Sequence, residues 1–170
     1  DRLEEATTSY GKALAIKSDY AKVHNNLGNT LRDLNKLEQA MASYRKALNI
    51  HPDYAEAHSN MGLVLRDIGK PEDAVTSFQR ALAIKPTYVD ATIHLGEILR
   101  ELDRPTEAFT CHRRAISLAP QNDLAWSTFA GSLENISFFA SVDDGLCQDL
   151  LQLLERDTVG PSYIAKTIIN

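Results

Sequence analysis

The segment Leu27–Tyr54 reads LGNTLRDLNKLEQAMASYRKALNIHPDY, and the chain repeats it with substitutions 34 residues later as MGLVLRDIGKPEDAVTSFQRALAIKPTY. A fixed period of this length is typical of solenoid proteins, in which each repeat is one supersecondary unit that buries its apolar face against its neighbours. The repeat therefore indicates the fold class before any other feature of the chain.

Apolar and small residues occupy fixed columns of the repeat. The first half holds the columns Leu27, Met61, Leu95 and Phe129; Gly28, Gly62, Gly96 and Ala130; and Leu31, Leu65, Leu99 and Leu133. The second half holds Ala6, Ala40, Ala74 and Ala108; Tyr10, Tyr44, Phe78 and His112; and Ala13, Ala47, Ala81 and Ala115. Spacings of three and four place each set on one face of a helix. We predict paired helices at 21–34 and 37–50, 55–68 and 71–84, and 89–102 and 105–118.

The small residues indicate how the two helices of a pair meet. Gly28 lets the second helix approach the first closely, and we expect Ala40 and Ala47 to face it. Tyr44, between these alanines, is expected to fill the space toward the next pair. Pro52 cannot continue a helix and disfavours helical angles at the residue before it, so the second helix is expected to end there.

These residues, above all Leu27, Gly28, Ala40, Tyr44 and Ala47 with their copies one and two repeats later, resemble the tetratricopeptide repeat family. The resemblance implies an all-α fold, a right-handed superhelical solenoid of helix-turn-helix repeats. One column departs from the family, which usually has a large aromatic residue there. It holds His24, His58, Thr92 and Trp126, and we expect weaker packing at the first three positions.

The repeat divides the chain into an array and an end region. We predict a half repeat at 1–20, full repeats at 21–54, 55–88 and 89–122, the first helix of a degenerate repeat at 123–136, and C-terminal capping helices within 137–170. Because the first repeat lacks one helix, we expect either a longer natural array or a homo-oligomer through this face. We also expect the chain to continue beyond Asn170.

The end region contains one amphipathic segment. A helix is expected to start near Asp143, which can cap it. Its apolar face would hold Leu146, Leu150, Leu153 and Leu154 and cover the last pair of helices.

Composition argues against several classes of protein. The net charge of −5 and the scattered basic residues give no support to nucleic-acid binding. No apolar run approaches the ~18 residues of a membrane span, and the charged N-terminus is unlike a signal peptide, so we expect a cytoplasmic location. Cys111 and Cys147 lack metal-ligand spacing, and no phosphate-binding or metalloprotease motif occurs. We therefore expect no catalytic residue, metal or cofactor.

Polar columns of the first helices are the candidate binding surface. We predict a groove lined by Asn25, Asn26, Asn29, Arg32, Ser59, Asn60, Leu63, Arg66, His94, Glu97 and Arg100. A side-chain amide both donates and accepts hydrogen bonds, which complements a peptide unit. The repeats are similar to those of the O-linked N-acetylglucosamine transferase family, in which an asparagine ladder at the column of Asn26 and Asn60 holds a peptide backbone. His94 and Thr128 depart from that ladder, and solvated helix positions are the alternative interpretation.

The arginine column allows two interpretations. Arg32, Arg66 and Arg100 could bind acidic groups of a ligand, or they could pair with the acids that follow them, on neighbouring helices. The carboxylate clamp of some tetratricopeptide domains requires basic residues where this chain has Asn25, Asp90 and His94, so that mode is not expected.

Two functions fit this sequence. The first is a protein-interaction scaffold that binds an extended peptide or a partner protein in the groove, with no catalysis of its own. The second is the substrate-recognition arm of a larger enzyme, such as a glycosyltransferase or a methyltransferase.

Overall fold

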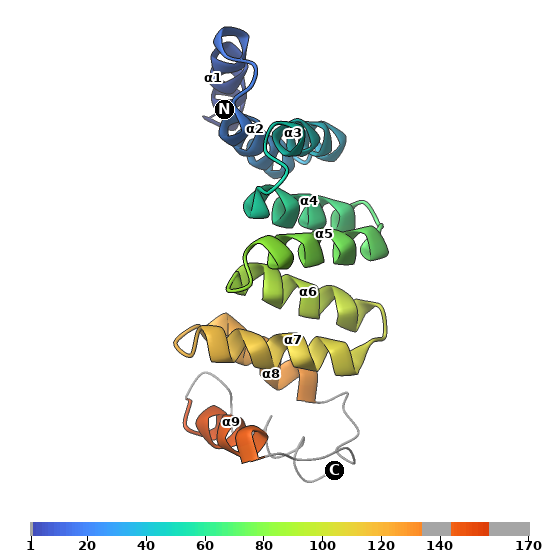
Figure 1. Ribbon diagram of the computed structural model, residues 1–170, viewed down its shortest axis with the longest axis vertical. Helices are drawn as coiled ribbons and strands as arrows, with labels where there is room; N and C mark the ends of the chain where they lie inside the picture. Colours follow the sequence, from blue (N-terminus) through green and yellow to red (C-terminus); the bar gives the residue numbers. More distant parts are fainter. Residues whose placement is uncertain (1, 134–143, 157–170) are drawn as a thin grey trace. The chain divides into compact units, whose positions relative to one another are not determined.

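The computed structural model describes residues 2–133 and 144–156, which form helices without strands (Figure 1). The helices are α1 Arg2–Ile16, α2 Ala21–Asp33, α3 Leu37–Ile50, α4 Ala55–Asp67, α5 Pro71–Ile84, α6 Val89–Glu101, α7 Pro105–Leu118, α8 Asp123–Leu133 and α9 Asp144–Leu154. The predicted all-α array of paired helices is confirmed. None of the described helices is both long and apolar enough to span a membrane.

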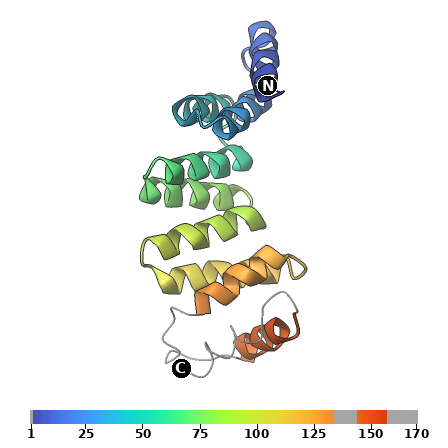
Figure 2. The ribbon, with the colours of Figure 1, turned by 180° about the vertical axis from the view of Figure 1, so that it is seen from behind.

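The chain divides into two compact units, 1–91 and 92–170, with the division inside α6. In the first unit α1 packs on α2, α2 on α3, α3 on α4 and α4 on α5, as Figure 1 and Figure 2 show from opposite sides. In the second unit α7 packs on α8. Each repeat thus contributes a first helix (α2, α4 or α6) and a second helix (α3, α5 or α7).

A left-handed residue ends each first helix. Asn35, Gly69 and Asp103 occupy the same column and have φ angles of 56°, 75° and 56°. The amide that follows each of them bonds back to a carbonyl five residues earlier, for example from Lys36 N to Leu31 O at 2.8 Å. This is the Schellman pattern, which satisfies helix-end carbonyls and turns the chain into the second helix.

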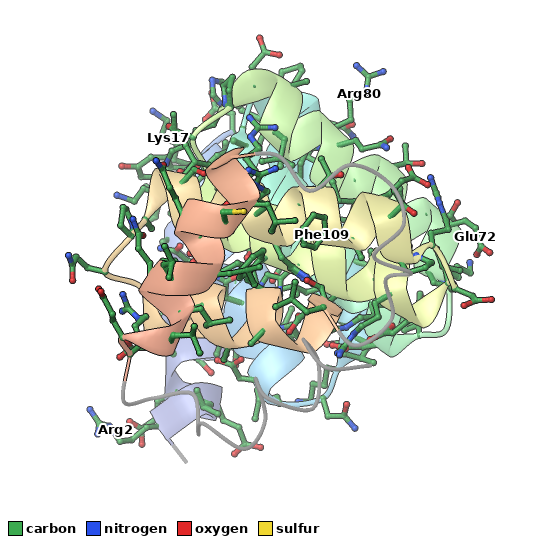
Figure 3. The ribbon with its side chains drawn as sticks, turned by 90° about the horizontal axis from the view of Figure 1, so that it is seen from below. Arg2, Lys17, Glu72, Arg80 and Phe109 are labelled. Atoms are coloured by element: carbon green, nitrogen blue, oxygen red, sulfur yellow. The ribbon has the colours of Figure 1, made fainter. Side chains whose placement is uncertain are left out.

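The core of each pair follows the small and aromatic columns. Ala74, Phe78 and Ala81 of α5 are fully buried, as are their counterparts in α3. Glu72 and Arg80 of the same helix are exposed and project away from the ribbon (Figure 3). This division is the expected amphipathic pattern of a helix with one apolar stripe.

A ring-on-glycine contact closes each pair. A Cβ atom built on Gly28 would lie 2.5 Å from Tyr44 Cε1, and one on Gly62 would lie 2.9 Å from Phe78 Cζ. The three atoms nearest to the Cβ on Gly28 all belong to the Tyr44 ring, which corrects the expected role of Tyr44: its ring fills space inside its own pair. Ala40 and Ala47 are fully buried, and their predicted contact with Gly28 stays a prediction. The ring needs the flat backbone of a glycine to reach the buried position between the helices.

The loops between repeats are closed by ring N–H groups. Nε2 of His24 lies 2.9 Å from Ser18 O, Nε2 of His58 lies 2.8 Å from Pro52 O, and Trp126 Nε1 donates to Pro120 O at 2.8 Å. A carbonyl can only accept, so both histidines carry hydrogen on Nε2. Histidine thus makes the loop contact that tryptophan makes in the last of these repeats, and weaker packing at His24, His58 and Thr92 stays a prediction.

Helix α9 covers part of the last pair. Leu146 and Leu153 are buried, and Asp149 Oδ2 accepts a hydrogen bond from Arg113 Nε of α7 at 2.7 Å. Leu154, the last residue of the helix, is 52% exposed, so its predicted place on the packed face is wrong. Asp143, the predicted cap, and the predicted structure of 157–170 lie outside the described residues.

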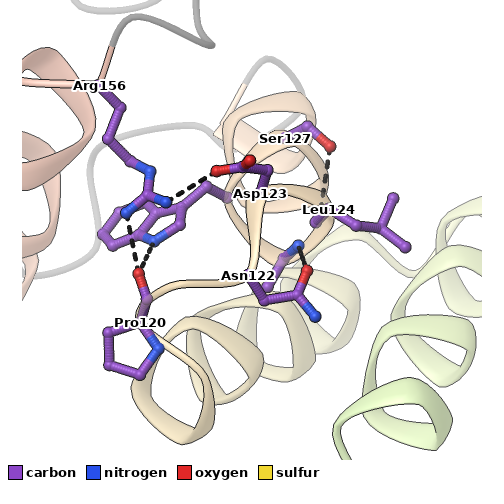
Figure 4. A network of polar contacts seen from close by, with 8 residues as sticks. Pro120, Asn122, Asp123, Leu124, Ser127 and Arg156 are labelled. Carbon is purple, nitrogen blue, oxygen red and sulfur yellow. Dashed lines mark hydrogen bonds and ion pairs between the residues drawn. The ribbon is translucent and has the colours of Figure 1, made fainter.

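Arg156 ties the end of α9 to the loop before α8 (Figure 4). Its guanidinium donates to Pro120 O at 2.8 Å and to Asp123 Oδ1 at 2.9 Å, and it lies 5.1 Å from the centre of the Trp126 ring. One carbonyl thus receives hydrogen bonds from both Trp126 and Arg156. This cation–π and hydrogen-bonded cluster holds α9 against its neighbours.

The ring-on-glycine contact predicts opposite effects of alanine at two helical glycines. Gly28→Ala should destabilise the protein by about 1–3 kcal/mol, because the new methyl group overpacks the Tyr44 ring. Gly11→Ala in α1 should stabilise by up to about 1 kcal/mol, because its Cβ meets nothing within 4 Å and alanine is the better helix former. Urea unfolding followed by far-UV circular dichroism measures both. Equal stability of the two variants would contradict the contact.

Candidate functional site

The first helices of the first unit adjoin through a pair of asparagines. Asn60 Nδ2 of α4 donates to Asn25 Oδ1 of α2 at 3.1 Å. Asn25 is only 5% exposed, so its side chain lies between the helices and not on a ligand-facing surface. This corrects the prediction that Asn25 lines the groove: its contact orients the amide of Asn60.

Ser59 is likewise interior. It is 3% exposed and forms a hydrogen bond with Tyr88. Burial of the phenol, with the nearby charges of Glu56 and Asp90, raises the pKa of Tyr88, and the hydrogen bond with Ser59 opposes this shift. The predicted groove position of Ser59 is therefore corrected as well. Asn25 and Ser59 share one column, which packs one repeat against the next.

Asn26 and Asn60 keep part of their side chains exposed. The amide of Asn26 makes no hydrogen bond with the described residues, while Asn60 uses one of its two N–H groups on Asn25. Asn60 therefore retains one N–H and its carbonyl oxygen for a ligand. The two amides lie on adjoining first helices of the same unit, one repeat apart.

The ring of the second helix reaches the residue that follows the glycine of the first helix. Tyr44 donates its hydroxyl to Asn29 Oδ1 at 2.7 Å, and burial raises the pKa of Tyr44 to about 12. In the next repeat Phe78, which has no hydroxyl, accompanies Leu63. The sequence shows the column of Tyr44 and the column of Asn29. It does not show that the two residues bond, because that requires the ring of α3 to reach the exposed side of α2.

In the third repeat, the same two positions hold residues that can carry a charge. His112 takes the ring position and Glu97 the position of Asn29. Burial of the imidazole, together with the nearby charge of Arg100, lowers the pKa of His112 to about 4, although Glu97 opposes this shift. Glu97 also lies 3.2 Å from His94 Nδ1, so the predicted groove residues His94 and Glu97 contact each other. These residues belong to the second unit.

Two arginines of the arginine column each pair with the acid that follows them in the same helix. Arg32 Nη2 lies 3.7 Å from Asp33 Oδ1, and Arg66 Nε lies 4.0 Å from Asp67 Oδ1, with all four side chains partly exposed. The acids are those expected, but each belongs to the same helix as its arginine, which corrects the expectation of pairing between helices. An exposed pair of this kind contributes about 0–1 kcal/mol, so Asp33 holds the Arg32 guanidinium only weakly. Arg100 is exposed.

Comparison with known proteins assigns the family. Models of the TPR repeat match residues 1–31 and 28–69, and models of the tetratricopeptide repeat match 55–88 and 89–122. The chain therefore belongs to the tetratricopeptide repeat family. No curated protein matches the sequence.

Solved structures share the fold. The chain is similar to MamA, with a TM-score of 0.74, 20% identity, and coverage of 98% of this chain and 89% of that one. It is also similar to YrrB, described as a TPR protein with an unusual peptide-binding site, with a TM-score of 0.73, 27% identity, and coverage of 87% and 74%. The resemblance to the glycosyltransferase repeats, and with it the alternative of an enzyme's recognition arm, stays a prediction.

The Tyr44–Asn29 hydrogen bond predicts that substitutions at the equivalent residues of the next repeat, Phe78 and Leu63, depend on each other. Phe78→Tyr alone should destabilise by about 1–3 kcal/mol, because the buried hydroxyl would meet Leu63 and lack an acceptor. Adding Leu63→Asn should recover most of the loss by recreating the Tyr44–Asn29 hydrogen bond. A double-mutant cycle in urea tests this, and additive losses would contradict the coupling.

The buried imidazole predicts a pH-dependent stability. The pKa of His112 is about 4 when folded and 6.5 for an unperturbed imidazole, so the unfolded chain binds the proton first. Stability is therefore lost as pH falls from 6.5 toward 4, by about 2 kcal/mol between pH 7 and pH 5. His112→Phe should remove this part of the pH dependence. Urea unfolding at both pH values, followed by Trp126 fluorescence, measures it; the same pH slope in both proteins would contradict the assignment.

Proposed function

We propose that this protein is an interaction scaffold that binds an extended polypeptide along the first helices of its repeats. The observation that carries the proposal is the Asn25–Asn60 hydrogen bond at 3.1 Å. It holds the Asn60 amide in one orientation at the junction of α2 and α4, with an N–H and a carbonyl oxygen still unused. An oriented amide loses less side-chain freedom when it binds a peptide unit.

The spacing of the amides also favours an extended ligand. Packed helices lie about 8–10 Å apart, and an extended chain advances about 3.3 Å per residue. Asn26 and Asn60, one repeat apart, would therefore meet peptide units about three residues apart. Recognition of the backbone at each repeat requires no particular ligand sequence.

The surrounding side chains would add selectivity. Asn29, held by Tyr44, offers a fixed amide, while Leu63 offers an apolar contact in the next repeat. Arg32 is partly exposed and paired only weakly with Asp33, so an acidic group of the ligand could replace that partner. YrrB, a related structure with a peptide-binding site, supports the class of ligand.

The test is the loss of both amides. A fluorescein-labelled dodecapeptide selected from a random phage library on the intact protein serves as probe. Asn26→Ala with Asn60→Ala should weaken its binding by about 1–3 kcal/mol, about 5- to 150-fold, in fluorescence anisotropy. Methylation of alternate backbone amides of the probe should weaken it similarly.

Asn49→Ala is the matched control, because Asn49 is an exposed asparagine on the second helix α3. It should leave the affinity unchanged. If the double variant binds the probe as tightly as the parent protein, backbone recognition by these amides is wrong.

A further inference from the structure

A column of tyrosines precedes the first helices. Tyr20, Tyr54 and Tyr88 recur one repeat apart, and each has a basic residue three positions earlier. Lys17 Nζ lies 5.4 Å from the centre of the Tyr20 ring, and Lys85 Nζ lies 4.8 Å from that of Tyr88. In two of the three repeats, therefore, the tyrosine ring already contacts an ammonium group.

Tyr54 is the exception. The basic residue three positions before it is His51. The centres of the His51 and Tyr54 rings lie 5.7 Å apart, in an edge-on arrangement with an interplanar angle of 65°. An imidazole edge supplies no ammonium group, so Tyr54 has no lysine over its ring among the described residues. A tyrosine face attracts cations through its quadrupole, and guanidinium groups stack on it well.

An open cleft of about 640 Å³ surrounds Tyr54 within the first unit. Its apolar lining includes Tyr20 of the loop between α1 and α2, and Ile50 and Ile84, which are the last residues of α3 and α5. Tyr20 is 50% exposed and Ile50 is 39% exposed. The cleft therefore offers apolar contact for an aliphatic side chain beside the Tyr54 ring.

The charges in the cleft favour a cation. Its lining includes the carboxylates of Asp19, Asp53 and Glu56 and the ammonium groups of Lys22 and Lys85. Glu56 and Lys85 are paired, with 3.4 Å between Oε1 and Nζ. Asp19 and Asp53 are exposed and have no ion pair among the described residues, which leaves two carboxylates against Lys22.

We propose that this cleft binds an arginine of a partner polypeptide, with an adjacent aliphatic residue against Ile50 and Ile84. The guanidinium stacks on Tyr54 and pairs with the carboxylates of Asp19 and Asp53. This site goes beyond the proposed function, because the cleft includes neither residue of the asparagine surface, which is formed by Asn26 of α2 and Asn60 of α4. It would select among partners by charge, which recognition of a peptide backbone cannot do.

The experiment uses the blocked dipeptide N-acetyl-leucyl-arginine amide and NMR of the ¹⁵N-labelled protein. The amide signals of Ile50, Tyr54 and Ile84 should shift on titration. The matched probe with citrulline, which has nearly the same shape without the charge, should bind at least three-fold more weakly. Raising the salt concentration should weaken the arginine probe and leave the citrulline probe unaffected.

Variants separate the contribution of the Tyr54 ring from that of the carboxylates of Asp19 and Asp53. Tyr54→Leu keeps an apolar side chain and should weaken the arginine probe at least three-fold through loss of the aromatic face. Asp19→Asn with Asp53→Asn changes only exposed side chains, so it tests the charge even if the tyrosine variant folds poorly, and it should abolish the preference over citrulline. Lys22→Gln should strengthen binding.

Three results would overturn the proposal. The first is equal affinity for the arginine and citrulline probes. The second is a set of shifts centred on Asn26 and Asn60 instead of Tyr54. The third is a shift of the Tyr54 signal with protein concentration alone, because it would assign the cleft to a second copy of the chain. The Asn26→Ala, Asn60→Ala protein should bind the arginine probe normally, so failure here is distinguishable from failure of the proposed function.

Discussion

In each repeat an aromatic or imidazole ring on the second helix rests directly on a glycine of the first. A Cβ atom on Gly28 or Gly62 would lie 2.5 or 2.9 Å from ring atoms, and one on Gly96 would clash with the ring of His112 in the same way. This contact fixes how near the two helices come, and it buries the ring completely. The other polar contacts of the repeat depend on that separation, because hydrogen bonds require their atoms within about 3 Å.

The ring contact also connects the core to the exposed surface. A ring that crosses beneath the first helix ends near the residue that follows its glycine, so the tip of the ring sets the chemistry there. Tyr44 holds the Asn29 amide, whereas His112 lies near the charges of Glu97 and Arg100. Variation of one core position thus changes the side-chain chemistry on the partly exposed face of its repeat while the backbone stays the same. This is a physical reason why a repeat fold can serve many partners.

The two surfaces that we propose on the first unit would differ in selectivity. The asparagine surface of Asn26 and Asn60 would offer donors and acceptors without charge, which suit any peptide backbone. The cleft around Tyr54 offers an aromatic face and unpaired carboxylates, which suit a cation. Their separation means that a long partner could engage both, and its affinity would then exceed that of either site alone.

The sequence alone determined the repeat, the helices and their ends, because these depend on local spacing, on proline and on columns of small residues. It also placed Asn26 and Asn60 in one column. It could not distinguish Asn25 from Asn26, since both are asparagines and both suit a helix surface. Successive residues of a helix point about 100° apart, so packing of the next repeat buried Asn25 and left Asn26 partly exposed. The partners of Tyr44 and Asn60, and the cleft around Tyr54, likewise arise from contacts between helices or loops far apart in the chain, which only the tertiary structure decides.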